Sequence, residues 1–190
     1  MPPYIKRADN DADRTYYQTV FAKPLGSIAA PTAGLHFTNA LLKRLENQGH
    51  PLEKVTLHVN NATFKPVKEK KITNHKMHEE EYHVLKKTYQ NLEKYKTQKR
   101  PIVAVGTTGC RVLETLAHTR KLEGQTNIFI YPGYQFQMTD CLITNFHLPY
   151  STLLMLVYAF GGKNLITRAY QEAIKEKYRF YSYGDAMMIL

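Results

Sequence analysis

Apolar residues recur with two different periods along this 190-residue chain, and the changes of period predict its elements. Spacings of three or four mark helices, and alternating or continuous apolar runs mark strands. The predicted helices cover residues 39–48, 89–95, 111–119, 151–160 and 165–177, and the predicted strands cover residues 17–22, 55–59, 82–85, 101–105, 127–131 and 141–144. Because strands alternate with helices, we expect one α/β domain over residues 1–190, in which helices cover a parallel or mixed sheet.

Between these elements lie segments without a clear period. Residues 1–13 are predicted to be an extended lead-in, Asn60-Asn61 a turn, and residues 65–76 a basic loop. The sequence shows no internal repeat and no low-complexity tract.

Small residues and reactive groups are combined in one segment, from Ala29 to Thr38. It reads Ala-Ala-Pro-Thr-Ala-Gly-Leu-His-Phe-Thr and leads into a helix for which Thr38 is the predicted N-cap. Small residues such as Gly34 let a ligand approach the backbone. Thr32 adds a hydroxyl, and His36 adds an imidazole that exchanges protons near neutral pH. The segment therefore indicates a ligand-contact turn.

A second candidate site follows the predicted strand 101–105, where Gly-Thr-Thr-Gly leads into a helix. Ligands of α/β sheets bind outside the carboxyl ends of strands, and a helix start favours a carboxylate or phosphate. Thr107 and Thr108 offer hydroxyls there, and Arg111 offers a forked donor. The alternative is a tight strand-to-helix turn with Thr108 as N-cap, since the spacing matches no Walker loop and no dinucleotide fingerprint.

The strand predicted over residues 141–144 ends in the same way. Asn145 and His147 follow it, and Ser151 or Thr152 would cap the next helix. Both side chains stand where a strand end would meet a ligand. The alternative is that Asn145 makes a turn and His147 satisfies backbone groups.

A third cluster reads Asn-His-Lys-Met-His-Glu-Glu-Glu over residues 74–81. His75 and His78 beside carboxylates raise the possibility of a metal, but no zinc-type spacing accompanies them. Solvated charge and RNA contact rank above a metal, and general acid–base catalysis by His78 or Glu80 is the third option.

Charge and composition narrow the class of protein. The formal net charge is +10 and the isoelectric point is near 9.5, which favours a polyanionic partner, with nucleic acid ahead of a membrane surface. A hydrophobic content of 43% argues against disorder. Cys110 and Cys141 both lie in apolar runs. The first residues lack a signal-peptide pattern, and the most apolar run, residues 148–160, is too short to span a bilayer. We therefore expect a reduced, cytoplasmic protein without a membrane segment.

Taken together, the motifs resemble the S-adenosylmethionine:tRNA ribosyltransferase-isomerases of queuosine biosynthesis. The matching segments run from end to end and are residues 2–5, 17–20, 26–38, 56–59, 77–80, 105–108, 113–114, 129–134, 143–149, 151–155 and 183–187. The resemblance covers the C-terminal part of the family's main domain. It implies an α/β fold that lacks the family's N-terminal portion and inserted β-barrel.

The resemblance also implies a reaction. The family transfers and isomerises the ribosyl part of S-adenosylmethionine onto 7-aminomethyl-7-deazaguanine at the wobble position of tRNA. Epoxyqueuosine-tRNA forms, adenine and methionine leave, and S-adenosylmethionine is a cosubstrate with no metal implied. The residues then expected to be catalytic are His36, His78, Glu80 and His147, with His36 the leading candidate for proton transfer. Those expected to bind substrate are Thr32, Gly34, His58, Thr107, Thr108, Arg111 and Asn145.

Three readings of the function stay open from the sequence. The chain is an active ribosyltransferase-isomerase, an inactive fragment that binds tRNA, or one half of a split enzyme. Phosphate contacts would come from lysines at positions 65, 68, 70, 71, 76, 86 and 87. The sequence does not indicate an oligomeric state.

Overall fold

The computed structural model describes residues 11–23, 26–27, 29–59, 72 and 75–190. In chain order its helices are α1 (Asp11–Tyr16), the 3-10 helix η1 (Thr32–His36), α2 (Asn39–Asn47), α3 (Lys86–Thr97), α4 (Gly106–Thr119), α5 (Thr152–Gly161) and α6 (Lys163–Lys175). Its strands are β1 (Val55–His58), β2 (Glu80–Val84), β3 (Val103–Val105), β4 (Glu123–Thr126), β5 (Cys141–Asn145) and β6 (Ala186–Ile189). The predicted turn at Asn60-Asn61 and most of the basic loop 65–76 lie outside the described residues.

The strands form two three-stranded sheets. One is antiparallel, with the order β1-β2-β4. The other has the order β3-β5-β6, in which β5 pairs with β3 in parallel and with β6 in antiparallel register. The α/β class, with helices flanking small sheets of which one is mixed, is therefore confirmed. The expectation that the strands would share one sheet was wrong for the described part of the chain.

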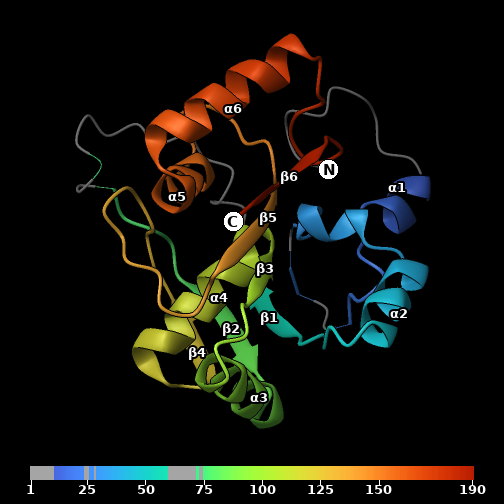
Figure 1. Cartoon of the computed structure of the whole chain (residues 1–190), viewed down its shortest axis with the longest axis vertical. Coiled ribbons are helices and arrows are strands. Elements are labelled where there is room, and N and C mark those ends of the chain that lie inside the picture. The colour runs from blue at the N-terminus through green and yellow to red at the C-terminus, as the bar shows by residue number, and fades with distance from the viewer. Residues whose placement is uncertain (1–10, 24–25, 28, 60–71, 73–74) are drawn as a thin grey trace.

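Helix α4 joins the two sheets at the centre of the molecule (Figure 1). It contacts β1 on one side, and β3, β5 and η1 on the others. Its apolar side chains Cys110, Val112 and Leu116 are fully buried, because a central helix needs apolar residues around most of its circumference. The amino end of α4 lies beside the end of β5, so both predicted strand ends come together there.

Helices α1 and α2 lie on one side of this centre, α3 lies below it, and α5 and α6 lie above it (Figure 1).

Two N-caps are confirmed: the hydroxyl of Thr38 accepts from the N–H of Leu41 at 3.1 Å, and that of Ser151 accepts from the N–H of Leu154 at 3.1 Å. Within the described ranges, no helix has the length and apolarity needed to cross a membrane.

Several local predictions were wrong. Residues 17–22 form turns after α1 rather than a strand, and residues 11–13 are helical rather than extended. Residues 127–131 form no strand. The apolar character there reflects burial of Ile130 and ring packing of Phe129 on Tyr131 with centroids 5.1 Å apart, and the strand lies just before it as β4.

Helix α4 begins five residues earlier than predicted. Gly106 has φ of +83°, a value that glycine adopts without strain, so β3 passes directly into the helix. The N-cap is Val105, which excludes Thr108 from that role. Arg111 consequently lies inside the helix, in its second turn.

Candidate functional site

A pocket opens where the ends of β3 and β5 meet the amino end of α4. Its volume of about 80 Å³ holds several water molecules or one end of a larger ligand. Six of the predicted site residues line it: Thr32, Thr107, Thr108, Arg111, Asn145 and His147. Small or apolar residues of the segment 29–33, together with Gly106, Phe146 and Leu148, form much of the remaining wall.

The predicted ligand-contact segment, residues 29–38, meets Asn145 at this pocket. The Asn145 side chain is almost fully buried at the end of β5, and its Oδ1 accepts a hydrogen bond from the Thr32 hydroxyl at 3.1 Å. Its Nδ2 lies 3.4 Å from Nε2 of the exposed His36 ring. The structure thus brings Asn145 against two predicted residues, Thr32 and His36, that lie more than a hundred positions before it in the sequence.

Arg111 is buried beneath the pocket and forms an ion pair with Glu80 through its Nη1. Glu80 is the first residue of β2 and is itself 2% exposed. The two other guanidinium nitrogens of Arg111, Nε and Nη2, are buried and have no hydrogen-bond partner among the described residues. Buried charged donors without partners are costly, so this edge of the guanidinium favours an anionic ligand.

His147 forms another part of the pocket wall. Its Nε2 lies 2.8 Å from the Thr144 hydroxyl, and its backbone N–H donates to the Tyr170 hydroxyl at 2.9 Å. Burial lowers the pKa of His147 to about 4. The ring is therefore neutral at neutral pH and can act there as a hydrogen-bonding group or proton acceptor.

The depressed pKa of His147 predicts a loss of stability in acid. Unfolded histidine binds a proton near pH 6.5, whereas folded His147 does so only near pH 4, so stability falls as the pH drops through this window. The shift corresponds to about 3 kcal/mol. Urea unfolding at pH 7.0 and 4.5 measures this loss as a difference in the free energy of unfolding. A His147→Gln variant should lose this contribution, whereas His50→Gln, at an exposed position, should keep it; equal acid sensitivity of all three proteins would contradict the assignment.

Five predicted residues do not line the pocket: His36 and Glu80, which contact the lining residues Asn145 and Arg111, and His78, His58 and Gly34. His78 is exposed just before β2. His58 ends β1 beside Gly26, and a Cβ added at Gly26 would lie 3.1 Å from Nδ1 of His58. Gly34 is buried inside η1, and a Cβ there would lie 2.6 Å from Cζ of Phe21. The small size of Gly34 therefore serves packing, and the contact of Gly34, His58 and His78 with substrate stays a prediction.

Sequence reasoning assigned no role to a C-terminal loop that completes the wall. Tyr181 and Ser182 line the pocket, and the backbone carbonyls of Gly184 and Asp185 lie 3.3 and 3.4 Å from Nδ2 of Asn145. The motif at residues 183–187 belongs to the resemblance, which was the available signal. Nothing in its residue types indicates that it folds back onto the end of β5.

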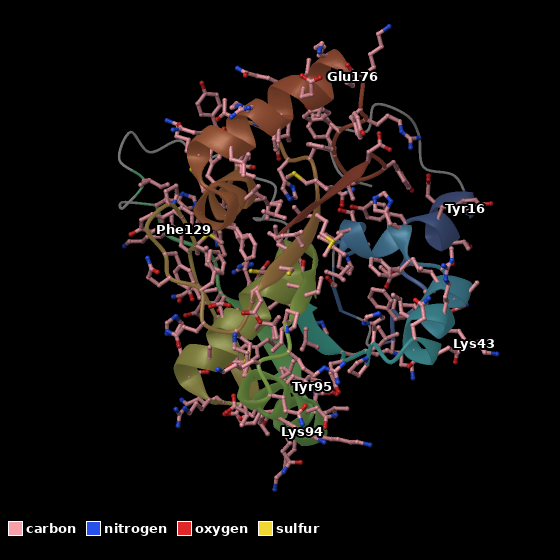
Figure 2. All side chains as sticks on the ribbon, viewed as in Figure 1. Tyr16, Lys43, Lys94, Tyr95, Phe129 and Glu176 are labelled. Carbon is pink, nitrogen blue, oxygen red and sulfur yellow. The ribbon has the colours of Figure 1, made fainter. Side chains whose placement is uncertain are left out.

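Charged side chains away from the pocket point outward, as Figure 2 shows for Lys43, Lys94 and Glu176. Among the described residues, no group of three His, Cys, Asp or Glu side chains is placed to hold a metal ion. In the cluster at 74–81, the His75 ring packs edge-on against Phe129. Cys110 and Cys141 are both free thiols.

Comparison with known proteins places these features in a family. The profile of a family described as "Queuosine biosynthesis protein" matches residues 1–189. The chain belongs to this family. The family match extends over both sheets and every pocket segment described above.

Among the relatives of this chain, the S-adenosylmethionine:tRNA ribosyltransferase-isomerase of Sulfurihydrogenibium sp. (strain YO3AOP1) is 57% identical over 190 residues. The enzyme of the same name from Treponema denticola is 52% identical over 195 residues. Both matches cover 100% of this chain and 56% of the relative. The chain thus spans little more than half the length of these relatives.

A solved structure is similar as well. The crystal structure of S-adenosylmethionine tRNA ribosyltransferase from Thermotoga maritima has a TM-score of 0.71 and 46% sequence identity. The alignment covers 83% of this chain and 51% of that one. The similarity confirms that the mixed α/β arrangement is the family's fold.

Proposed function

We propose that this chain forms the S-adenosylmethionine site of a tRNA ribosyltransferase-isomerase. The reaction transfers the ribosyl group of S-adenosylmethionine to 7-aminomethyl-7-deazaguanine at the tRNA wobble position and isomerises it, giving epoxyqueuosine-tRNA, adenine and methionine. Family membership supports the reaction class. The pocket at the ends of β3 and β5 supports the place of binding.

The free edge of Arg111 carries this proposal. Nε and Nη2 lie on the same side of the planar guanidinium and together form a fork that matches a carboxylate. Glu80 holds Nη1, so the ion pair fixes the plane of the guanidinium, and Nε and Nη2 are left buried without a partner among the described residues. The carboxylate of the methionine part of S-adenosylmethionine fits this fork, with Thr107 and Thr108 beside it at the start of α4.

Such anchoring places the reacting ribose among the other polar groups of the pocket. The sulfonium acidifies the neighbouring ribose carbon, so a positioned base can remove a proton, and adenine departs more easily when it is protonated. Methionine leaves as a neutral thioether. The His36 ring contacts Asn145 and His147 lines the pocket, and we assign proton transfer to these two rings, with Glu80 acting through Arg111.

The tRNA would meet the lysine-rich surface. Lys86 and Lys87 are exposed at the start of α3, and Lys76 is exposed ahead of β2. Positions 65, 68, 70 and 71 lie outside the described residues. Phosphate contacts of this kind predict strongly salt-dependent binding.

Two free cysteines are consistent with a reducing compartment, and we place the reaction in the cytoplasm.

One assay tests the proposal. The purified chain is mixed with S-adenosylmethionine and tRNA that carries the precursor base, and adenine release is followed by chromatography. Release by the chain alone supports the proposal. Release only after addition of the N-terminal half of a relative supports the split-enzyme reading. Salt-sensitive tRNA binding, without S-adenosylmethionine binding or adenine release under either condition, would overturn the proposal in favour of a tRNA-binding fragment.

A further inference from the structure

We infer that Asn145 is a positioning residue that holds neutral His36 in its Nδ1–H tautomer, so that His36 faces the substrate as a hydrogen donor. The inference deepens the proposed function and rests on it for the identity of the substrate. It is carried by the hydrogen bonds around one buried amide. The Asn145 side chain is 1% exposed, so its amide takes its partners from the protein.

The orientation of the Asn145 amide follows from its partners. Two backbone carbonyls, of Gly184 and Asp185, lie 3.3 and 3.4 Å from Nδ2. Carbonyl oxygens only accept hydrogen bonds, so the NH₂ end must face them. On the other side, the Thr32 hydroxyl donates to Oδ1 at 3.1 Å. A flipped amide would set its oxygen against two carbonyl oxygens, which excludes that orientation.

The orientation of the amide determines which nitrogen of His36 carries the proton. Nδ2 of Asn145 shares its two hydrogens among three neighbours, the two carbonyls and Nε2 of His36 at 3.4 Å, and it has no lone pair to offer. Nε2 must therefore be the unprotonated acceptor of the neutral ring, and the proton lies on Nδ1. Asn145 thus occupies the lone pair at Nε2, and Nδ1–H is left to donate to the substrate.

The C-terminal loop keeps this arrangement in place. The Asp185 carboxylate accepts from the backbone N–H of Arg179 at 2.7 Å and pairs with its guanidinium at 2.8 Å, which closes the loop. Hydrogen bonding to Arg179 lowers the pKa of Asp185. A Cβ at Gly184 would lie 2.4 Å from the carbonyl oxygen of Arg179, so the loop requires glycine there.

Nitrogen NMR of the histidine rings tests the tautomer directly. Long-range ¹H–¹⁵N spectra of the labelled chain are recorded at a pH where the rings are neutral, and the His36 signals are assigned from their absence in His36→Asn. We expect a pyrrole-like Nδ1 and a pyridine-like Nε2. An unrestrained histidine favours the opposite pattern, so a protonated Nε2 would overturn the inference. In folded Asn145→Ala, the His36 pattern should revert to protonated Nε2.

Turnover of two matched variants tests the donor role. The side-chain amide nitrogen of asparagine can stand near the position of Nδ1, and that of glutamine near the position of Nε2. We therefore expect His36→Asn to retain at least tenfold more adenine release than His36→Gln, with His36→Ala slowest by about 10²–10⁴-fold relative to the unchanged chain. Equal or reversed rates of the Asn and Gln variants would overturn the donor role.

The two measurements separate this inference from the proposed function. If the unchanged chain releases no adenine and binds no S-adenosylmethionine, the proposed function fails, and the NMR pattern still decides the tautomer. If adenine release is normal and Nε2 is protonated, the proposed function stands and the positioning role of Asn145 is wrong.

Discussion

Arg111→Lys is expected to weaken S-adenosylmethionine binding by at least tenfold while the chain stays folded. A lysine ammonium can keep an ion pair with Glu80, but it lacks the planar edge formed by Nε and Nη2. Charge-assisted hydrogen bonds contribute about 1.5–3 kcal/mol each, so losing one of the pair corresponds to at least a tenfold effect. Calorimetric titration of the chain with S-adenosylmethionine measures the dissociation constant, and urea unfolding measures the fold.

The choice of substitution decides whether this experiment is informative. Arg111→Ala breaks a buried ion pair by removing the guanidinium beside Glu80, which costs about 3–5 kcal/mol of stability and confuses binding with folding. Arg168→Lys is the matched control, because Arg168 is exposed on α6, away from the pocket residues. Unchanged affinity in a folded Arg111→Lys variant would show that the free edge of Arg111 does not hold the cosubstrate.

The parts of the site that could be predicted are those whose chemistry is local. The end of a buried strand followed by small and polar residues marks a ligand position in α/β proteins, and this rule located both Thr107 and Asn145. The N-caps at Thr38 and Ser151 were found for the same reason, since a cap depends on residues three positions away.

The parts that could not be predicted depend on contacts between distant segments. Arg111 and Glu80 were each singled out, but nothing in the sequence pairs the second turn of α4 with the first residue of β2. The division of strands between two sheets is of the same kind, because β1 and β3 have similar apolar patterns. Tertiary pairing, rather than local propensity, decides which sheet each strand joins.

Glu114 shows how such long-range contacts also determine stability. Its side chain is fully buried in α4, and its carboxylate accepts from the backbone N–H groups of Gln137, Met138 and Thr139 at 2.9–3.1 Å. The Tyr134 hydroxyl donates to the same carboxylate at 3.1 Å, and burial together with this charge raises the pKa of Tyr134. One side chain therefore anchors the loop that leads into β5 and the pocket.

Glu114→Ala is expected to destabilise the chain by at least 3 kcal/mol. The substitution opens a cavity and leaves the N–H groups of Met138 and Thr139 buried without an acceptor, and each such group costs about 1–3 kcal/mol. Since an ordinary domain is stable by about 5–15 kcal/mol, the urea midpoint should fall by 1 M or more.

The control for Glu114→Ala is a glutamate that forms an ion pair on the surface. Glu172 pairs with Lys175 on the surface of α6 at 3.0 Å, and Glu172→Ala should change the free energy of unfolding by less than about 1 kcal/mol. Glu114→Gln should fall between the two alanine variants, because one amide oxygen still accepts while the NH₂ end opposes a backbone N–H. A loss below 1 kcal/mol in Glu114→Ala would mean that the loop into β5 is held by its ring contacts, such as Tyr134 on Phe136, rather than by the buried carboxylate.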